Sequence, residues 1–322
     1  MKKKISVFLI VLTILALSQL PLIVMALEYD ENVSLTITSS GPVLGAVSLT
    51  DNSDVATTSV DPEATYKVKF SVSDSNTLDD LTDIVVDIYY ETQSAVDIRR
   101  SYTFTWTEGA GSTPFTSSPA GYVVSSVTPT AAEELASSFN FELHFSLDGV
   151  AVPSGAATTW HIDVTVTDDS SNTDSDTTTV FDVTLFHSIT ASTSTIAFGS
   201  AIPGGSLTKQ SVTVTFTANS EVNIDVQGAD LVSGSDTISA DQFNAWDDSA
   251  GTPSAHTLST SDTTIYAAYK AVTDAINAGI TGYTDAGDRL LGFDGTVPDP
   301  QASGTYTAVW KIKIDQSIVT PS

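Results

Sequence analysis

The sequence predicts an all-β protein built from two tandem antiparallel β-sandwiches, with one short helix inserted in the second. Apolar residues alternate with Thr and Ser along most of residues 27–322, which is the period of a strand with one buried face. The segments TYKVKFSVS and FNFELHFSL show this alternation most clearly. One-sided strands are typical of antiparallel sheets packed face to face, because parallel sheets covered on both faces have continuous apolar runs.

The first predicted domain spans residues 27–186. Its seven strand positions suggest an immunoglobulin-like sandwich, and they are Val33–Leu49, Thr65–Ser73, Asp83–Tyr90, Ser101–Thr107, Phe139–Leu147, Trp160–Thr167 and Thr177–Leu185. The connection Glu108–Ser138 is too long for a hairpin. Within it we expect a short edge strand at Tyr122–Ser125 and a capped helical turn around Thr128–Glu134.

The second predicted domain spans residues 187–322 and follows the first without a Pro- or Gly-rich linker, so we expect a stiff junction. Its expected strands are Ser188–Ala191, Thr195–Gly199, Ser211–Thr217, Glu221–Gln227, Arg289–Phe293 and Thr305–Ile314. One segment, Thr264–Gly279, has apolar residues at helical spacings of four, three and four. We expect it to form a helix that closes an open end of the sandwich.

Residues 1–26 have the pattern of a secretory signal peptide: three lysines, an apolar run and a small residue at the expected cleavage site. The alternative is an uncleaved anchor, since Ile5–Ala26 is long enough to cross a bilayer. We expect cleavage before Leu27. The IDQSIVTPS terminus carries no anchoring signal, so the expected location is secreted, extracellular or at the cell surface, without a membrane contact after cleavage.

Charge and composition restrict the possible partners and chemistry. The chain carries 39 acidic and 12 basic residues, a formal charge of −27, and losing Lys2, Lys3 and Lys4 would take it to −30. Such a chain is repelled by nucleic acid and by anionic lipid, and it attracts cations. Cysteine is absent, so a secreted protein of this composition is stabilised without disulfides.

Two aspartate-rich turns, one after the strand at 65–73 and one after the strand at 160–167, form the sharpest constellation. Calcium takes six to eight oxygens from carboxylates, amides and the main chain, and such turns provide them. The spacing is not that of an EF-hand, because the invariant glycine and the glutamate at position twelve are missing. The candidate ligands are Asp74, Asn76, Asp79, Asp80, Asp83, Asp168, Asp169, Asn172, Asp174 and Asp176.

The expected topology places both turns, together with the connection Glu108–Ser138, at one pole of the first sandwich. Many like-charged oxygens gathered there repel one another unless a cation or wide exposure to water offsets the repulsion. We therefore expect one or two calcium ions at this pole. The alternative is a solvated, aspartate-rich hairpin tip.

The stretches TYKVKFSVSDSNTLDDLTDIVVDIYY and WHIDVTVTDDSSNTDSDTTTVFDV resemble immunoglobulin-like modules of secreted archaeal and bacterial surface proteins. STIAFGSAIPGG, SVTVTFTANSEVNIDVQGADL and VPDPQASGTYTAVWKIKI are similar to a β-sandwich that often follows such modules in surface-layer-associated or filament-forming proteins. The first of these resemblances covers about half of the chain beyond the signal, and both imply structural, adhesive or assembly roles. The chain differs from many of these proteins in lacking a C-terminal anchor.

No catalytic signature is present. The sequence contains no HExxH, G-x-S-x-G or phosphate-binding loop pattern, and it has no thiol nucleophile. We therefore expect a protein that is not an enzyme. A secreted hydrolase using carboxylates from distant strands remains an alternative.

The leading functional hypothesis is an extracellular structural or adhesive protein whose partners are other surface proteins or copies of itself. Residues Leu27–Thr38, in which Val33, Leu35 and Ile37 alternate, suggest assembly by adding a strand to a neighbouring subunit. The alternative for this segment is an ordinary first strand. A binding module for glycans or another protein is the second hypothesis, with Trp246 and Tyr122 as candidate contact residues.

Overall fold

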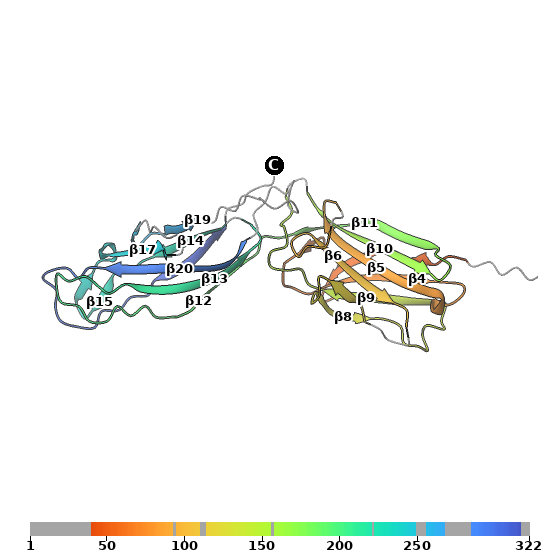
Figure 1. Cartoon of the computed structure of the whole chain (residues 1–322), viewed down its shortest axis with the longest axis horizontal. Coiled ribbons are helices and arrows are strands. Elements are labelled where there is room, and N and C mark those ends of the chain that lie inside the picture. Colours follow the sequence, from red (N-terminus) through yellow and green to blue (C-terminus); the bar gives the residue numbers. More distant parts are fainter. Residues whose placement is uncertain are drawn as a thin grey trace, which may run out of the picture. The chain divides into compact units, whose positions relative to one another are not determined.

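The computed structural model describes residues 40–92, 95–109, 114–155, 158–220, 222–248, 256–267 and 285–316. These residues form an all-β chain with two hydrophobic cores, one in each of two antiparallel sandwiches (Figure 1). The predicted signal peptide and the segment Leu27–Thr38 lie outside the described residues. Among the residues that are described, no helix has the length and apolarity needed to cross a membrane.

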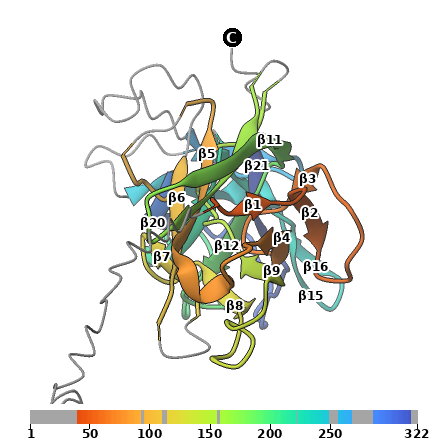
Figure 2. The same cartoon turned by 90° about the vertical axis from the view of Figure 1, so that its right-hand side faces the viewer.

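Two sheets form the first sandwich, and Figure 2 looks onto it along its strands. One sheet has the order β1-β4-β9-β8, with β2 also paired to β4; its strands are β1 (Val43–Leu44), β2 (Ser48–Asp51), β4 (Tyr66–Ser73), β8 (Val123–Val127) and β9 (Ser138–Phe145). The other has the order β3-β11-β10-β5-β6-β7; its strands are β3 (Ser59–Val60), β5 (Leu81–Tyr90), β6 (Ser101–Thr107), β7 (Thr116–Ser118), β10 (Trp160–Asp168) and β11 (Thr173–Val183).

The two sheets form an antiparallel β-sandwich, as the sequence predicts. All strand pairs are antiparallel except β3 with β11, which is parallel. Six of the seven predicted strand positions coincide with β4, β5, β6, β9, β10 and β11. Only the described end of the seventh, Val33–Leu49, can be compared; it contains β1 and the start of β2.

The long connection contains the structure expected of it. Strand β8 occupies the place of the predicted edge strand. The carboxylate of Glu133 accepts hydrogen bonds from the backbone N–H of Thr130 at 2.9 Å and from its hydroxyl at 2.8 Å. The bond from the Thr130 N–H is the one that the glutamate of a capping box makes. The N–H of Glu133 donates to the Thr130 carbonyl at 2.8 Å, and together these bonds fix the turn that follows.

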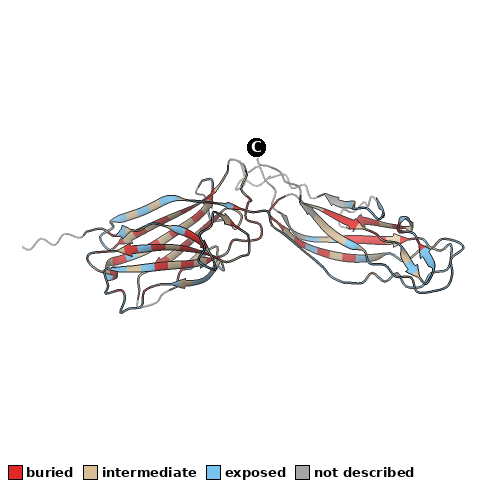
Figure 3. Cartoon of the chain, turned by 180° about the vertical axis from the view of Figure 1, so that it is seen from behind, coloured by how far each residue is buried: buried red, intermediate tan, exposed pale blue. Residues whose placement is uncertain are grey.

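The core of the first sandwich is aromatic, and buried positions alternate with accessible ones along its strands (Figure 3). The Trp160 ring lies 5.9 Å from Tyr90, 6.2 Å from Tyr102 and 6.1 Å from Phe181, measured between ring centroids. Its indole N–H donates to the carbonyl of Val152 at 2.8 Å. These four rings belong to one sheet. The contacts Phe104–Phe145 at 6.0 Å and Trp106–Phe141 at 5.3 Å join it to the other sheet, in a chain that has no cysteine.

The second sandwich contains a sheet of order β12-β13-β20-β17-β18 and a sheet of order β19-β14-β21, with the separate hairpin β15-β16. The strands are β12 (His187–Ala191), β13 (Gln210–Ala218), β14 (Val222–Gln227), β15 (Leu231–Ser233), β16 (Asp236–Ile238), β17 (Phe243–Asp247), β18 (His256–Thr257), β19 (Thr263–Ala267), β20 (Asp285–Gly295) and β21 (Lys311–Gln316). Two 3₁₀ turns complete the described elements: η1 (Leu78–Asp80) in the first sandwich and η2 (Ala240–Gln242) in the second.

Two predictions for the second sandwich need correction. The helix predicted over Thr264–Gly279 is wrong at its start, because Thr263–Ala267 forms strand β19, which pairs with β14. Pairing with a neighbouring strand overrides the helical spacing in a segment rich in β-branched residues. Residues 268–279 lie outside the described residues.

The strand predicted at Thr195–Gly199 is also wrong, since this segment has no strand partner. Its alternating apolar side chains, Ile196 and Phe198, nevertheless pack against the second core. Phe198 lies 5.6 Å from Phe243 and 6.0 Å from Trp310 between ring centroids. Core packing without a hydrogen-bonded ladder therefore produces the same alternation in the sequence.

Phe141 contacts both sheets of the first sandwich, which makes it a test of the core. It stacks on Phe70 of its own sheet at 5.5 Å and meets Trp106 of the opposite sheet edge-on at 5.3 Å. Phe141→Ala should lower the free energy of unfolding of this sandwich by about 3–5 kcal/mol, measured by urea denaturation. Val124→Ala, at a side chain that is 53% exposed, is the control; equal losses in the two variants would contradict this packing.

Candidate metal centre

Two turns and the long connection meet at one pole of the first sandwich, as the sequence predicts. The first turn runs from the end of β4 through η1 to β5, and the second joins β10 to β11. The N–H of Asp169 donates to the carbonyl of Asp80 at 2.8 Å, which ties the second turn to the first. The N–H of Asp79 donates to the carbonyl of Glu134 at 2.9 Å, which ties the long connection to η1.

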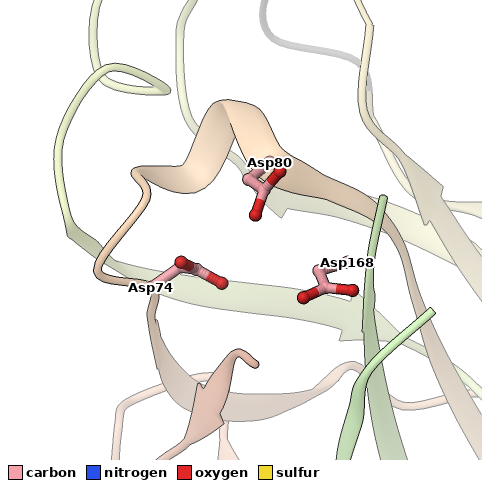
Figure 4. A group of neighbouring side chains, drawn as sticks. All are labelled: Asp74, Asp80 and Asp168. Atoms are coloured by element: carbon pink, nitrogen blue, oxygen red, sulfur yellow. The ribbon is translucent and has the colours of Figure 1, made fainter. Parts of the chain in front are cut away.

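Three aspartates from these two turns bring their carboxylates together. Asp74 follows β4, Asp80 ends η1 and Asp168 ends β10, and each offers an oxygen within 4.8 Å of the others. Figure 4 shows the three carboxylates pointing toward one common space. Asp74 is 2% exposed and Asp168 is 1% exposed, whereas Asp80 is half-buried.

The three carboxylates differ in how completely their oxygens are hydrogen-bonded. Oδ1 of Asp168 accepts from the backbone N–H of Asn172 and Oδ2 accepts from its side-chain amide, both at 2.7 Å. Asp80 accepts from the amide of Asn76 at 3.1 Å. Oδ1 of Asp74 accepts from the backbone N–H of Asn76 at 2.7 Å, but its buried Oδ2 has no hydrogen-bond partner among the described residues.

An orphaned buried carboxylate oxygen is costly, because it has lost water without gaining a donor. The neighbouring carboxylates add repulsion: two unit charges 4.8 Å apart repel by about 3 kcal/mol at an effective dielectric constant of 20. A bound cation would remove both costs together.

The donor set fits a hard divalent cation. All three groups are carboxylates, and hard oxygen donors are the ligands of calcium and magnesium rather than of zinc or copper. Two oxygens bound to one calcium ion at about 2.4 Å each lie at most about 4.8 Å apart, so the three carboxylates can share one ion without a rearrangement of the backbone. Main-chain carbonyls and water would complete the six to eight ligands that calcium takes.

The turn that carries Asp79 and Asp80 is strained at its start. Thr77 has a φ of 83°, a value that a β-branched residue rarely adopts. Such a conformation costs on the order of 1–3 kcal/mol and persists only where the surroundings impose it. The main-chain bonds from η1 to the long connection and to the second turn are those surroundings.

The remaining seven predicted ligands do not join this group. Asn76 and Asn172 orient its carboxylates through hydrogen bonds. Asp169 accepts from the hydroxyl of Thr82 at 3.0 Å, and Asp83 lies within β5. The other three are Asp79, described below, and the β11 residues Asp174 and Asp176.

The two β11 residues have a structural role instead. Asp174 accepts from the backbone N–H of Leu44 at 2.8 Å. Asp176 accepts from the backbone N–H of Val47 at 3.4 Å and from the backbone N–H and hydroxyl of Thr178 at 2.8 and 2.7 Å. These bonds, with that of Thr178 first among them, lower the pKa of Asp176. Both side chains therefore attach the first described segment of the chain to the opposite sheet.

A second acidic group at the same pole was not predicted as a whole. It consists of Asp79, Glu108 and Glu134, whose carboxylates also lie within 4.8 Å of one another. Glu134 is 4% exposed, and burial, followed by the nearby charges of Glu108 and Asp79, raises its pKa. Sequence reasoning missed the two glutamates because they lie at the ends of a long connection rather than in an aspartate-rich turn.

The candidate contact residues for a sugar are not displayed. Trp246 is 5% exposed. Tyr122 packs edge-on against Tyr102 with ring centroids 4.9 Å apart, and its hydroxyl donates to Asp148 at 2.5 Å. Every described Trp and Tyr for which burial is known is buried or half-buried. Trp246 and Tyr122 are therefore not exposed candidates for contact with a sugar: Tyr122 packs against the first core, and Trp246 is buried.

No protein-family model matches the chain, and no curated protein sequence matches it. Solved structures that are similar to it include two of BcpA, the major pilin subunit of Bacillus cereus, at 9% and 10% identity with TM-scores of 0.28 and 0.27. These alignments cover 70% and 77% of this chain and 56% and 66% of that subunit. A chaperone–tip adhesin complex of CFA/I fimbriae biogenesis matches at 12% identity and a TM-score of 0.28, covering 87% of this chain and 85% of that one.

Asp74→Asn tests the electrostatics of the first group in the absence of metal. The variant removes one charge from three crowded carboxylates, and its new amide N–H can donate to Asp80 or Asp168. In excess chelator its free energy of unfolding should therefore exceed that of the natural sequence by about 1–3 kcal/mol, measured by urea denaturation. Asp169→Asn at the same pole is the control, with a change within about 0.5 kcal/mol; a destabilised Asp74→Asn would contradict the repulsion.

Proposed function

We propose that the protein is a non-catalytic structural or adhesive component of the cell exterior, whose first sandwich is stabilised by calcium. The observation that carries the calcium part is the orphaned Oδ2 of Asp74, a residue that is 2% exposed and whose carboxylate lies within 4.8 Å of those of Asp80 and Asp168. A bound ion would stabilise this unpartnered, buried oxygen and the neighbouring carboxylates. Extracellular fluids commonly supply calcium at concentrations that weak carboxylate sites can bind.

The absence of cysteine gives the ion a physical task. Small and medium extracellular domains are commonly stabilised by disulfides or by metals, and this chain has no cysteine. The proposed ion would join the end of β4, η1 and the end of β10, which belong to both sheets. It would thus link the two sheets at this pole.

A structural role also agrees with how the interiors are filled. Both cores consist of aliphatic and aromatic side chains. A cavity of about 290 Å³ in the second sandwich is lined by apolar residues with a few hydroxyls and no carboxylate. The hydrolase hypothesis requires a pocket with paired carboxylates, and this cavity does not supply one.

Calcium should therefore raise the melting temperature of the first sandwich. A ligand at a hundred times its dissociation constant adds about 2.7 kcal/mol to a state that it binds exclusively, which corresponds to a shift of roughly 5–10 °C for a domain of this size. Differential scanning calorimetry with calcium and with chelator measures it. The transition that Phe141→Ala lowers identifies the first sandwich.

The second sandwich provides an internal control for this measurement, since its transition should not move. Asp74→Asn should make the shift smaller, because the group of Asp74, Asp80 and Asp168 no longer contributes to it. Magnesium at equal concentration should also give a smaller shift, because magnesium dehydrates reluctantly and requires stricter geometry. A natural chain whose first transition is the same in calcium and chelator would contradict the proposal.

Assembly by strand addition is a second candidate, and the cavity of the second sandwich favours it. Within the part of the chain that the structure describes, β12 and β21 are edge strands, each paired with a single neighbour. Ile189 of β12 and Ile312 of β21 both line the cavity, together with the core residues Val226 and Phe293. The cavity thus lies between two sheets at edges that can accept another strand.

The proposed donor is Leu27–Thr38 of a neighbouring copy. In an extended strand Val33, Leu35 and Ile37 share one face, which is the pattern needed to fill an apolar groove while the backbone pairs with an edge strand. The residues between them are Ser and Thr, which suit the solvent side. Copies of the same chain would then be the partners of this protein.

Leu35→Asp in the mature chain should prevent such assembly, because a charge would enter the apolar groove. Negative-stain microscopy and sedimentation velocity would follow filament formation. Ser34→Asp, at the outward-facing position next to it, is the matched control and should assemble like the natural chain. Equal assembly of both variants would contradict strand addition.

A further inference from the structure

The second acidic group, Asp79, Glu108 and Glu134, lies where three segments of the first sandwich meet. Asp79 belongs to η1, Glu108 follows β6 and Glu134 belongs to the turn capped by Thr130. The N–H of Glu108 donates to the carbonyl of Thr82 at 3.1 Å, which holds its backbone beside β5. The three carboxylates are thus brought within 4.8 Å of one another by main-chain hydrogen bonds on separate segments.

Glu134 supplies an independent observation. The residue is 4% exposed, and among the described residues no hydrogen-bond donor is found for its carboxylate, which lies against two other acids. Glutamate is almost never buried unless it is paired. The adjacent Leu135 is 66% exposed, so the turn buries an acid and exposes an apolar side chain, the reverse of the usual preference.

The turn Thr130–Ala136 buries none of its own apolar side chains, although Pro129 just before it is buried. It is held by the capping bonds of Thr130 and by the bonds from Leu78 and Asp79 to the carbonyls of Ala136 and Glu134, both at 2.9 Å. These bonds direct the Glu134 carboxylate toward Asp79 and Glu108. Such an arrangement is stable where a cation neutralises the group.

We propose that Asp79, Glu108 and Glu134 bind a second divalent cation, which fixes the turn at Thr130–Ala136 of the long connection to the pole. This inference rests on the proposed calcium-stabilised pole and extends it from one site to two. The sites share η1, because consecutive residues contribute to them: Asp79 to the second and Asp80 to the first. An ion in either site would therefore restrict the same 3₁₀ turn, and binding at the two sites should be positively coupled.

Calcium titration by isothermal calorimetry on the mature chain tests the number of sites. The natural chain should bind two ions, Glu134→Gln one and Asp74→Asn one. Glu133→Gln is the matched control: it makes the same chemical change at the next residue, and Gln can keep the capping bonds to Thr130, so this variant should bind two ions. Glu108→Gln provides a second variant of the site, should Glu134→Gln fail to fold.

Hydrogen exchange locates the effect. Calcium should slow exchange of the backbone amides of Glu134 and Ala136 in Asp74→Asn and should not do so in Glu134→Gln. If Glu134→Gln loses the second ion but calcium has the same effect on exchange at this turn in both variants, the second ion does not fix the turn, and the proposal is contradicted.

The outcomes separate this inference from the proposed function. A single ion that Asp74→Asn loses and Glu134→Gln keeps would overturn the second site and leave the first. A single ion that Glu134→Gln loses and Asp74→Asn keeps would overturn the first site and leave the second. No measurable binding by the natural chain would overturn both.

Discussion

The burial of one apolar face by the strands β4, β5, β9 and β10 of the first sandwich is the constraint on which the rest of the structure depends. Strands β5 and β10 alternate buried and accessible residues along nearly their whole length, and the buried faces of the two sheets meet in an aromatic core. A slip of one residue in the pairing of either strand would place its charged residues in that core. The register is therefore fixed, and with it the points at which β4 and β10 end.

The acidic pole follows from that register. Because β10 pairs with β5 so that Asp168 lies opposite Leu81, the end of β10 comes to η1, and Asp168 comes to Asp80. Because β4 leads directly into the same turn, Asp74 is brought to them and buried. Burial of the apolar core thus offsets the repulsion between the three carboxylates. A cation bound to them would remove this repulsion and link the two sheets.

The sequence predicts the strands of the first sandwich well because their alternation has a single physical cause, the burial of one face. It also predicts that the two aspartate-rich turns share a pole, since the strand order determines which loops lie together.

The sequence does not predict which aspartates form a group. Asp174 and Asp176 have the same chemistry as Asp74, yet they accept hydrogen bonds from Leu44 and Val47, residues about 130 positions away in the chain. Glu134 is missed for a similar reason, since its burial depends on bonds between η1 and a distant turn. Alternation is also ambiguous in the second sandwich, where Ile196 and Phe198 pack inward without a strand and Thr263–Ala267 pairs as a strand within a helical spacing.

The most direct test of the account is a crystal structure of the mature chain grown in calcium, with anomalous diffraction recorded at a long wavelength. The account predicts a calcium ion, identified by its anomalous peak, that is bound to Oδ2 of Asp74 and to the carboxylates of Asp80 and Asp168 at distances of about 2.3–2.6 Å. A well-ordered pole without such a peak, in which Oδ2 of Asp74 accepts a hydrogen bond from water or from a protein donor, would contradict it.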